Sequence, residues 1–319
     1  MSSRTAEAAQ SPYNVIVSAE HTLHECRTIE EFRSRFATAT GCPVEQIADH
    51  VVRKSAPKAI FLVGSLPLGM GASGSDVDLI VLVDDRSALL DGGERAANSD
   101  QRLEFSSETD RLLAGIVLTL KQGIPVEVQV ALTPGVQEVY RRLRRRGPDL
   151  NEVEIRTLGR LSTGWQLVQT EGYLQERAVD LSDRSLTVYC STKNFVQALL
   201  QQIKAGRVLE RGDIPLALHL GRLSVEYAYL AYFASEGLPH LGSKWLAKIG
   251  FAEGAAQRVA RDPLLAHGIP LLFPALSSTG AAAQYLRDVS EFVASMRSLI
   301  ERRPLFRIAY AACAQIAAA

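Results

Sequence analysis

The spacing of hydrophobic residues along the chain changes character twice. Apolar residues recur at helical spacing between Val15 and Phe36, after a start rich in Ser and Ala, and a further helix is expected over 44–53. Between 59 and 132, short apolar runs alternate with turn residues, which is typical of strands. Helical spacing then returns from 136 onward. The pattern predicts a sheet between a helical lead-in and a larger helical region.

Three short runs in the middle region carry the strand pattern. They read AIFLVGS from Ala59, VDLIVLV from Val77 and IPVEVQVAL from Ile124. A helix is expected near 109–121, and the segment 91–107 has the Gly, Asn, Asp and Ser content of a loop. This order of elements predicts a small mixed sheet with flanking helices.

The second half of the chain reads as consecutive helices with Gly or Pro at several junctions. The expected segments are 136–146, 153–170, 185–207, 215–236, 243–260 and 281–302. We therefore predict an α+β protein in which residues 1–135 form a catalytic domain and residues 136–319 form a helical domain.

Composition narrows the class of protein. Lys plus Arg and Asp plus Glu are equal at 35 each, so no overall charge attracts nucleic acid or an anionic membrane, and any nucleic-acid surface would be local. The four cysteines are widely spaced and form no CxxC pair, which favours reduced thiols. No apolar signal segment or membrane-length run is present. We expect a cytoplasmic protein without a membrane partner, and the sequence leaves its oligomeric state open.

The glycine-rich stretch GSLPLGMGASG, from Gly64 to Gly74, formally contains GxGxxG. A dinucleotide-binding site needs a helix after the last glycine, whereas here the strand-like VDLIVLV follows. A P-loop needs Lys and Ser or Thr after its second glycine, but Met70 follows Gly69. A kinase would need an HRD segment, which is absent. These three nucleotide-binding classes are excluded.

Carboxylates in the two flanking strands suggest a metal site. Asp76 and Asp78 are two residues apart, so a strand places both side chains on one face. Glu127 lies in VEVQV, where the valines alternate inward and Glu127 shares the outer face with Gln129. Clustered carboxylates repel unless a cation neutralises them, and oxygen ligands suit Mg²⁺. An isolated acidic pair at a strand end is more often a solvated edge.

Gly64 and Ser65 directly follow the first apolar strand. The glycine allows close approach of a ligand to the backbone. The serine offers a hydroxyl and backbone N–H groups at an expected helix start, where a triphosphate would bind. We therefore assign Gly64 and Ser65 to nucleotide binding, beside the predicted metal ligands.

An apolar strand, Gly64-Ser65, ten intervening residues and Asp76-Val77-Asp78 resemble the signature of the DNA polymerase β-like nucleotidyltransferase superfamily. The resemblance implies a Mg²⁺-dependent enzyme, with two ions, that uses a nucleoside triphosphate, with ATP favoured. It also implies that Asp76 and Asp78 bind metal. The third carboxylate, Glu127, would bind metal or deprotonate the attacking hydroxyl. Many members have Asp at that position, so the role of Glu127 stays open.

The stretch 199–250 is similar to the helical domain of small-molecule and antibiotic nucleotidyltransferases. The matching residues are the turn Arg211-Gly212-Asp213 before a long helix and the pair Lys244-Trp245 after a glycine-containing loop. Lys244 and, more weakly, Lys193 are candidates for binding the triphosphate as point charges. The alternative for each is an ordinary surface lysine.

Three other features have structural explanations beside functional ones. The arginine cluster at 141, 142, 144, 145 and 146 is the best indication of a large substrate, but such runs are mostly solvated helix faces. His21, His24 and Cys26 have only loosely metal-like spacing. Tyr227, Tyr229 and Tyr232 have the helical spacing of core or groove residues.

Three functions are compatible with these observations. We favour transfer of a nucleoside monophosphate from a triphosphate to a hydroxyl of a small-molecule acceptor, with release of pyrophosphate. A nucleotidyltransferase that modifies a protein or tRNA, as a toxin does, is the rival enzyme. A non-catalytic nucleotide-binding regulatory module is the third, although such a module has little use for three clustered carboxylates.

Overall fold

The computed structural model describes residues 23–53, 57–71, 75–89, 106–109, 113–119, 124–145, 149–176, 179–239, 242, 263–274, 278–307 and 310. It divides into two compact units. One comprises Met1–Val136 and Gly164–Tyr173, and the other comprises Gln137–Thr163 and Leu174–Ala319. The segment 164–173 thus belongs to the first unit although it follows part of the second in the sequence.

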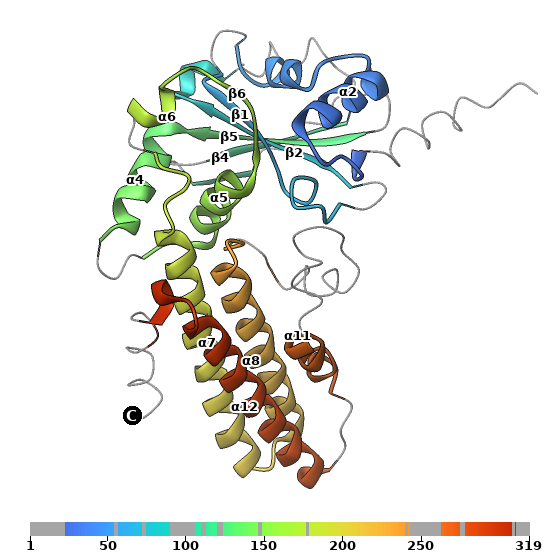
Figure 1. Cartoon of the computed structure of the whole chain (residues 1–319), viewed down its shortest axis with the longest axis vertical. Helices are drawn as coiled ribbons and strands as arrows, with labels where there is room; N and C mark the ends of the chain where they lie inside the picture. The colour runs from blue at the N-terminus through green and yellow to red at the C-terminus, as the bar shows by residue number, and fades with distance from the viewer. Residues whose placement is uncertain are drawn as a thin grey trace, which may run out of the picture. The chain divides into compact units, whose positions relative to one another are not determined.

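The first unit is built on a mixed sheet (Figure 1). Within the described residues its six strands have the order β3-β4-β5-β2-β1-β6. Their bounds are β1 Ala59–Val63, β2 Val77–Val83, β3 Ser106–Thr109, β4 Leu113–Thr119, β5 Pro125–Leu132 and β6 Trp165–Gln169. Among these described strands, only β2 and β5 pair in parallel, and the other neighbours pair antiparallel. Together with the helices described below, this confirms the predicted α+β fold class.

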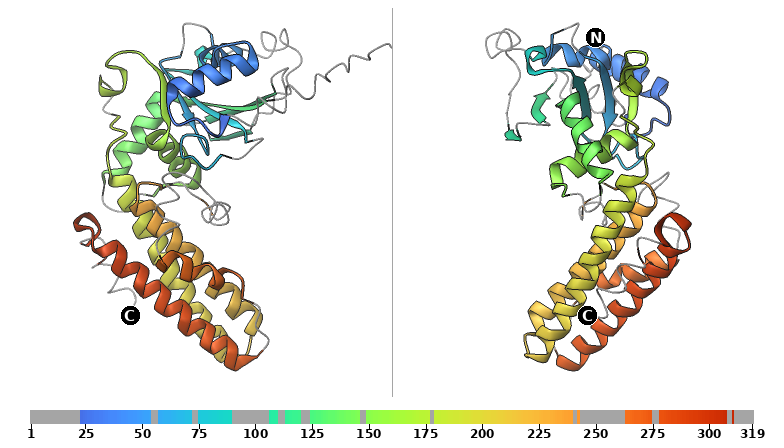
Figure 2. Two further views of the ribbon diagram at one scale, coloured as in Figure 1. Left: turned by 45° about the vertical axis from the view of Figure 1, so that its right-hand side comes forward. Right: turned by 90° about the vertical axis from the view of Figure 1, so that its left-hand side faces the viewer.

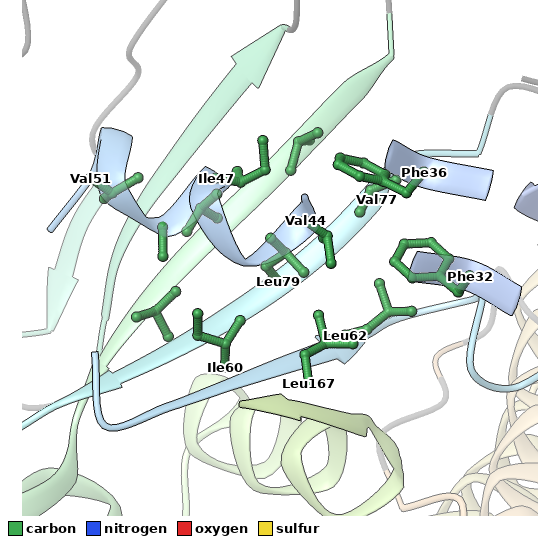
Figure 3. Close-up of a cluster of buried hydrophobic side chains, with 14 of the residues drawn as sticks. Phe32, Phe36, Val44, Ile47, Val51, Ile60, Leu62, Val77, Leu79 and Leu167 are labelled. Atoms are coloured by element: carbon green, nitrogen blue, oxygen red, sulfur yellow. The ribbon is translucent and has the colours of Figure 1, made fainter. Parts of the chain in front are cut away.

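One face of the sheet carries the main core of this unit. Helix α2 (Ile29–Thr40) and the 3-10 helix η1 (Val44–His50) cover it (Figure 3). Phe32 and Phe36 of α2 are fully buried against alternate residues of the strands, such as Leu62 and Leu79. Because strand side chains alternate, the residues between these, Asp78 among them, lie on the opposite face. The core therefore fixes which face carries the candidate site.

Two expected helices differ from the structure. The segment near 109–121 contains the strand β4, so a helix there is wrong. The helix expected over 153–170 is confirmed as far as Thr163, and the rest of that range contains β6. The remaining short elements are η2 Arg86–Ala88 and α6 Tyr173–Glu176. Most of the predicted loop 91–107 lies outside the described residues.

The second unit is helical (Figure 2). Its described helices are α4 Thr133–Leu143, which begins in the first unit, α5 Glu152–Thr163, α7 Ser185–Glu210, α8 Ile214–Ser235, α11 Pro263–Gly268, η4 Pro270–Leu272 and α12 Thr279–Glu301. The long helices α7, α8 and α12 pack side by side. The expected helix over 243–260 lies outside the described residues.

The turn between α7 and α8 has the expected chemistry. Gly212 has a φ of 81°, which favours glycine, and the Asp213 side chain accepts a hydrogen bond from the Leu216 N–H as the N-cap of α8. Polar contacts then join the two helices, because Ser191 donates to the Ala231 carbonyl at 2.8 Å and Ser224 to the Ala198 carbonyl at 2.8 Å. None of the described helices is both long and apolar enough to cross a membrane.

Candidate active site

Asp78 and Glu127 are neighbours across the parallel pair of strands. They are register partners, Asp78 near the start of β2 and Glu127 near the start of β5, so their side chains lie on the same face of the sheet. Both are half-buried. Further along the same face, Ile80 is fully buried. The two carboxylates therefore lie at the edge where this face meets solvent.

Gly64 lies against the side chain of Asp78. Strand β1 ends at Val63, the register partner of Asp78, and the chain turns at Gly64 with a φ of 79°. A Cβ atom at position 64 would lie 2.0 Å from Oδ2 of Asp78, which is far inside van der Waals contact. Both the backbone conformation and the space left for the carboxylate therefore require glycine here.

Ser65 occupies a different local structure from the one expected. Residues 64–69 form consecutive turns, so the predicted helix start at Ser65 is wrong. Ser65 is buried, and its carbonyl accepts a hydrogen bond from the Met70 N–H at 2.9 Å. The turn is closed by its own backbone hydrogen bonds, and it places Gly64 and Ser65 next to Asp78.

Asp76 stands apart from this pair. It is exposed and precedes β2, which begins at Val77. In the part of the chain that the structure describes, no group of three or more His, Cys, Asp or Glu side chains is placed to hold a metal ion. The structure thus brings Asp78, Glu127 and Gly64 together. Asp76, two residues before Asp78 in the sequence, is not part of this group.

The donor set nevertheless fits a divalent cation such as Mg²⁺. Two adjacent, half-buried carboxylates supply hard oxygen ligands, and Mg²⁺ commonly takes one or two carboxylates while water and substrate phosphates fill its other positions. Asp76, two residues before Asp78, is exposed and close enough in sequence to add a third.

Gln129 is a site residue that the sequence analysis did not assign. Its Nε2 donates a hydrogen bond to Oε1 of Glu127 at 2.5 Å, and its side chain is only 6% exposed. The signal was present in VEVQV, because residues 127 and 129 of a strand share a face. The pattern alone did not reveal that the two side chains are bonded.

Lys193 belongs to the second unit, where it lines a pocket of about 390 Å³ between α5, α7 and α8. Arg156, which the sequence did not single out, adds a second cation to the pocket, and Glu152 contributes one carboxylate. The remaining lining residues include Asn194, Tyr227, Cys190 and Leu230. The pocket suits a ligand with an anionic group and an apolar part. Lys244 and Trp245 lie outside the described residues.

The arginine cluster is largely engaged within the protein. Ion pairs join Arg141 to Glu138, Arg142 to Glu154 and Arg144 to Asp183. Arg145 is exposed, and Arg146 lies outside the described residues. Intramolecular pairing of three arginines leaves little of the cluster for the phosphates of a nucleic acid.

The remaining candidates are Tyr227, Tyr229 and Tyr232, and the group of His21, His24 and Cys26. Tyr229 and Tyr232 are buried core residues, as expected, whereas Tyr227 lines the Lys193 pocket. Cys26 is buried, and burial raises the pKa of its thiol, which disfavours the thiolate that a metal would need. His21 lies outside the described residues.

Comparison with known proteins identifies a family that matches part of the chain. The sequence profile of the nucleotidyltransferase domain family matches residues 44–147, a range that includes β1, β2 and β5. No curated protein gave a significant match. Among solved structures, the chain is similar to a nucleotidyltransferase-like protein from Exiguobacterium sibiricum 255-15, at 13% identity over 82% of this chain and 75% of that chain, with a TM-score of 0.40. A similarity this distant carries no argument about the site.

The family match covers every member of the group formed by Gly64, Ser65, Asp78 and Glu127. Residues 44–147 therefore resemble the nucleotidyltransferase domain family.

Proposed function

We propose that this protein transfers a nucleoside monophosphate from a nucleoside triphosphate, with ATP favoured, to a hydroxyl group of a small-molecule acceptor. The observation that carries the proposal is the register of Asp78 and Glu127 on one face of the sheet, with Gly64 beneath Asp78. This arrangement supplies paired oxygen ligands beside the turn that follows β1.

Asp78 and Glu127 would hold the divalent cation, and Asp76, two residues earlier in the chain, would add a third carboxylate. Bound there, Mg²⁺ would neutralise charge on the phosphates and orient the leaving group. The acceptor oxygen forms a bond to the α-phosphorus while the bond from that phosphorus to the bridging oxygen breaks, and pyrophosphate leaves. The hydroxyl proton passes to Glu127 or to solvent, and we leave both roles of Glu127 open.

Two observations favour a small acceptor. Lys plus Arg and Asp plus Glu balance at 35 each, and three arginines of the basic cluster are paired with carboxylates. A nucleic-acid acceptor would instead call for a basic surface free to contact phosphates. We also propose that Lys193, together with Arg156, binds phosphate groups in the second unit, as a pocket with two cations would allow.

Labelled substrate tests the proposal directly. The protein is incubated with Mg²⁺, cell extract and each α-³²P-labelled nucleoside triphosphate in turn. Label in small solutes supports the proposal. Label in protein or tRNA supports the macromolecule-modifying enzyme instead. Label that remains in the triphosphate for all four nucleotides supports the regulatory module.

Variants tie the activity to the site. Asp78→Asn and Glu127→Gln each remove one charge from the proposed cation site and should abolish transfer. Glu171→Gln is the matched control, because Glu171 is an exposed carboxylate in the same unit. Activity within a few-fold of the parent protein in either site variant would contradict the assignment.

A further inference from the structure

Gln129 and Glu127 form a bonded pair on β5. They lie two residues apart on one face, and Nε2 of Gln129 donates to Oε1 of Glu127 at 2.5 Å. An ionised carboxylate only accepts hydrogen bonds, so the amide must turn its NH₂ group toward Glu127. This fixes the orientation of the Gln129 amide and leaves its side-chain carbonyl oxygen available to accept a hydrogen bond from another group.

That carbonyl oxygen is buried and has no hydrogen-bond partner among the described residues. The register partners of Gln129 are Ile80 on β2 and Gly115 on β4, and neither residue type has a side chain that can donate. A buried polar oxygen without a partner is unfavourable, and such groups in native proteins usually have a functional reason. A donor that arrives with a ligand would satisfy it.

We propose that Gln129 is a positioning residue for the cation site. Its Nε2 holds the Glu127 carboxylate in one orientation, and its Oε1 accepts a hydrogen bond from the hydration shell of the bound cation. Residues that orient metal ligands in this way commonly matter nearly as much as the ligands. The inference rests on the proposed function, because Glu127 needs such support only if it binds the cation.

The test compares Gln129→Met with the parent protein. Methionine keeps the length of the side chain and removes both the donor and the unpartnered carbonyl, so the melting temperature should change by only a few degrees. Binding of Mn²⁺ alone, followed by electron paramagnetic resonance of the free ion, should weaken by about 10- to 100-fold. The kcat for the triphosphate found in the labelling experiment should fall while its KM changes by less than about 2-fold.

Gln166→Met is the matched control, because it makes the same chemical change at an exposed position of β6 in the same sheet. It should bind Mn²⁺ as the parent does. If Gln129→Met does not fold, Gln129→Asn serves instead, since it keeps an amide but is one methylene too short to reach Glu127. The same loss of Mn²⁺ affinity is expected.

The outcomes separate this inference from the proposed function. Parent-like Mn²⁺ binding and kcat in the folded Gln129 variant, alongside an inactive Glu127→Gln protein, would overturn the role of Gln129 alone. An active Glu127→Gln protein, or a parent protein that binds no Mn²⁺, would overturn the cation site itself.

Discussion

At the scale of single residues, the contact between Gly64 and Asp78 is the most constrained feature of the candidate site. In Gly64→Ala the new Cβ would lie 2.0 Å from the Asp78 Oδ2 atom, so the carboxylate must move. The left-handed backbone, with a φ of 79°, adds about 1 kcal/mol of strain. We expect transfer activity to fall by at least about 100-fold, because phosphoryl transfer depends on positioned ligands. Kinetic assays and thermal melts measure the two effects.

Gly41→Ala separates the two causes. Gly41 has a similar φ of 74°, and a Cβ there meets nothing within 4 Å, so this variant carries the backbone strain without the clash. It should lose a comparable amount of stability and keep its activity. Equal losses of activity in both variants would show that strain in the domain, and not displacement of Asp78, accounts for the effect.

Lys193 gives a second residue-scale prediction. Lys193→Ala removes one of the two cations that line the pocket beside α7, so binding of inorganic triphosphate to that pocket should weaken by about 10-fold. Lys204→Ala is the control, because Lys204 is exposed on the same helix and is not part of the pocket. Equal affinities for inorganic triphosphate in the two variants, measured by titration calorimetry, would return Lys193 to the class of surface lysines.

Some residues of this site could be predicted from the sequence and others could not. Alternation in VDLIVLV and VEVQVAL sufficed to place Asp78 and Glu127 outside the core, and the match to residues 44–147 supports the family. Alternation could not show that β2 begins at Val77 and leaves Asp76 exposed. Nor could it show that Gln129 bonds to Glu127, because strand periodicity specifies faces and not side-chain rotamers.

At the scale of elements, the predictions are wrong where an apolar run is compatible with both a helix and a strand. LAGIVLT in β4 has no clear alternation, and a continuous apolar run cannot be distinguished from a buried helix by its period alone. The sequence pattern predicts β6 as the end of the preceding helix, because only Gly164 separates α5 from β6. Pairing with β1, which is distant in sequence, decides the outcome.

The start of helix α5 depends on an ion pair that the sequence showed only as part of a basic cluster. Asn151 and Glu154 form a capping box, in which each side chain accepts a hydrogen bond from the other's backbone N–H at 2.9 Å. Arg142 adds a salt bridge to Glu154 at 2.6 Å, with side-chain exposures of 26% and 7%. The nearly buried carboxylate therefore depends on Arg142 for its charge compensation.

Arg142→Met should destabilise the second unit by about 2 kcal/mol, because it leaves the Glu154 carboxylate buried without its cation. Arg141→Met is the matched control. Arg141 is 60% exposed and pairs with Glu138 one turn away, so its loss should cost about 0.5 kcal/mol or less. Urea unfolding followed by far-ultraviolet circular dichroism measures both. Equal losses from the two arginines would contradict the distinct role given to Arg142.

At the scale of the whole molecule, the two units bury different chemistry. The core of the sheet unit is mainly aliphatic and phenylalanine on one face and includes one thiol, Cys26, whereas the core of the helical unit includes several titratable groups. Burial raises the pKa of the Cys190 thiol to about 12, and it also raises the pKa values of Tyr140, Tyr229 and Tyr285 above their usual range. All four residues belong to the second unit.

These groups predict that the helical unit loses stability in alkali. Each releases its proton at lower pH when unfolded, near 9.0 for the thiol and 10.0 for the phenols, than when buried. Their contribution is therefore complete below about pH 9 and is lost as pH rises, by up to about 1.4 kcal/mol per pH unit for each group that has begun to titrate in the unfolded chain. Thermal melts from pH 8 to pH 11 should show a decline that begins near pH 9 and steepens above pH 10. Cys190→Ala should reduce the first part of the decline, to which the buried Cys26 thiol also contributes, and keep the second part. A melting temperature that stays flat to pH 11 would mean that these groups reach solvent in the native state.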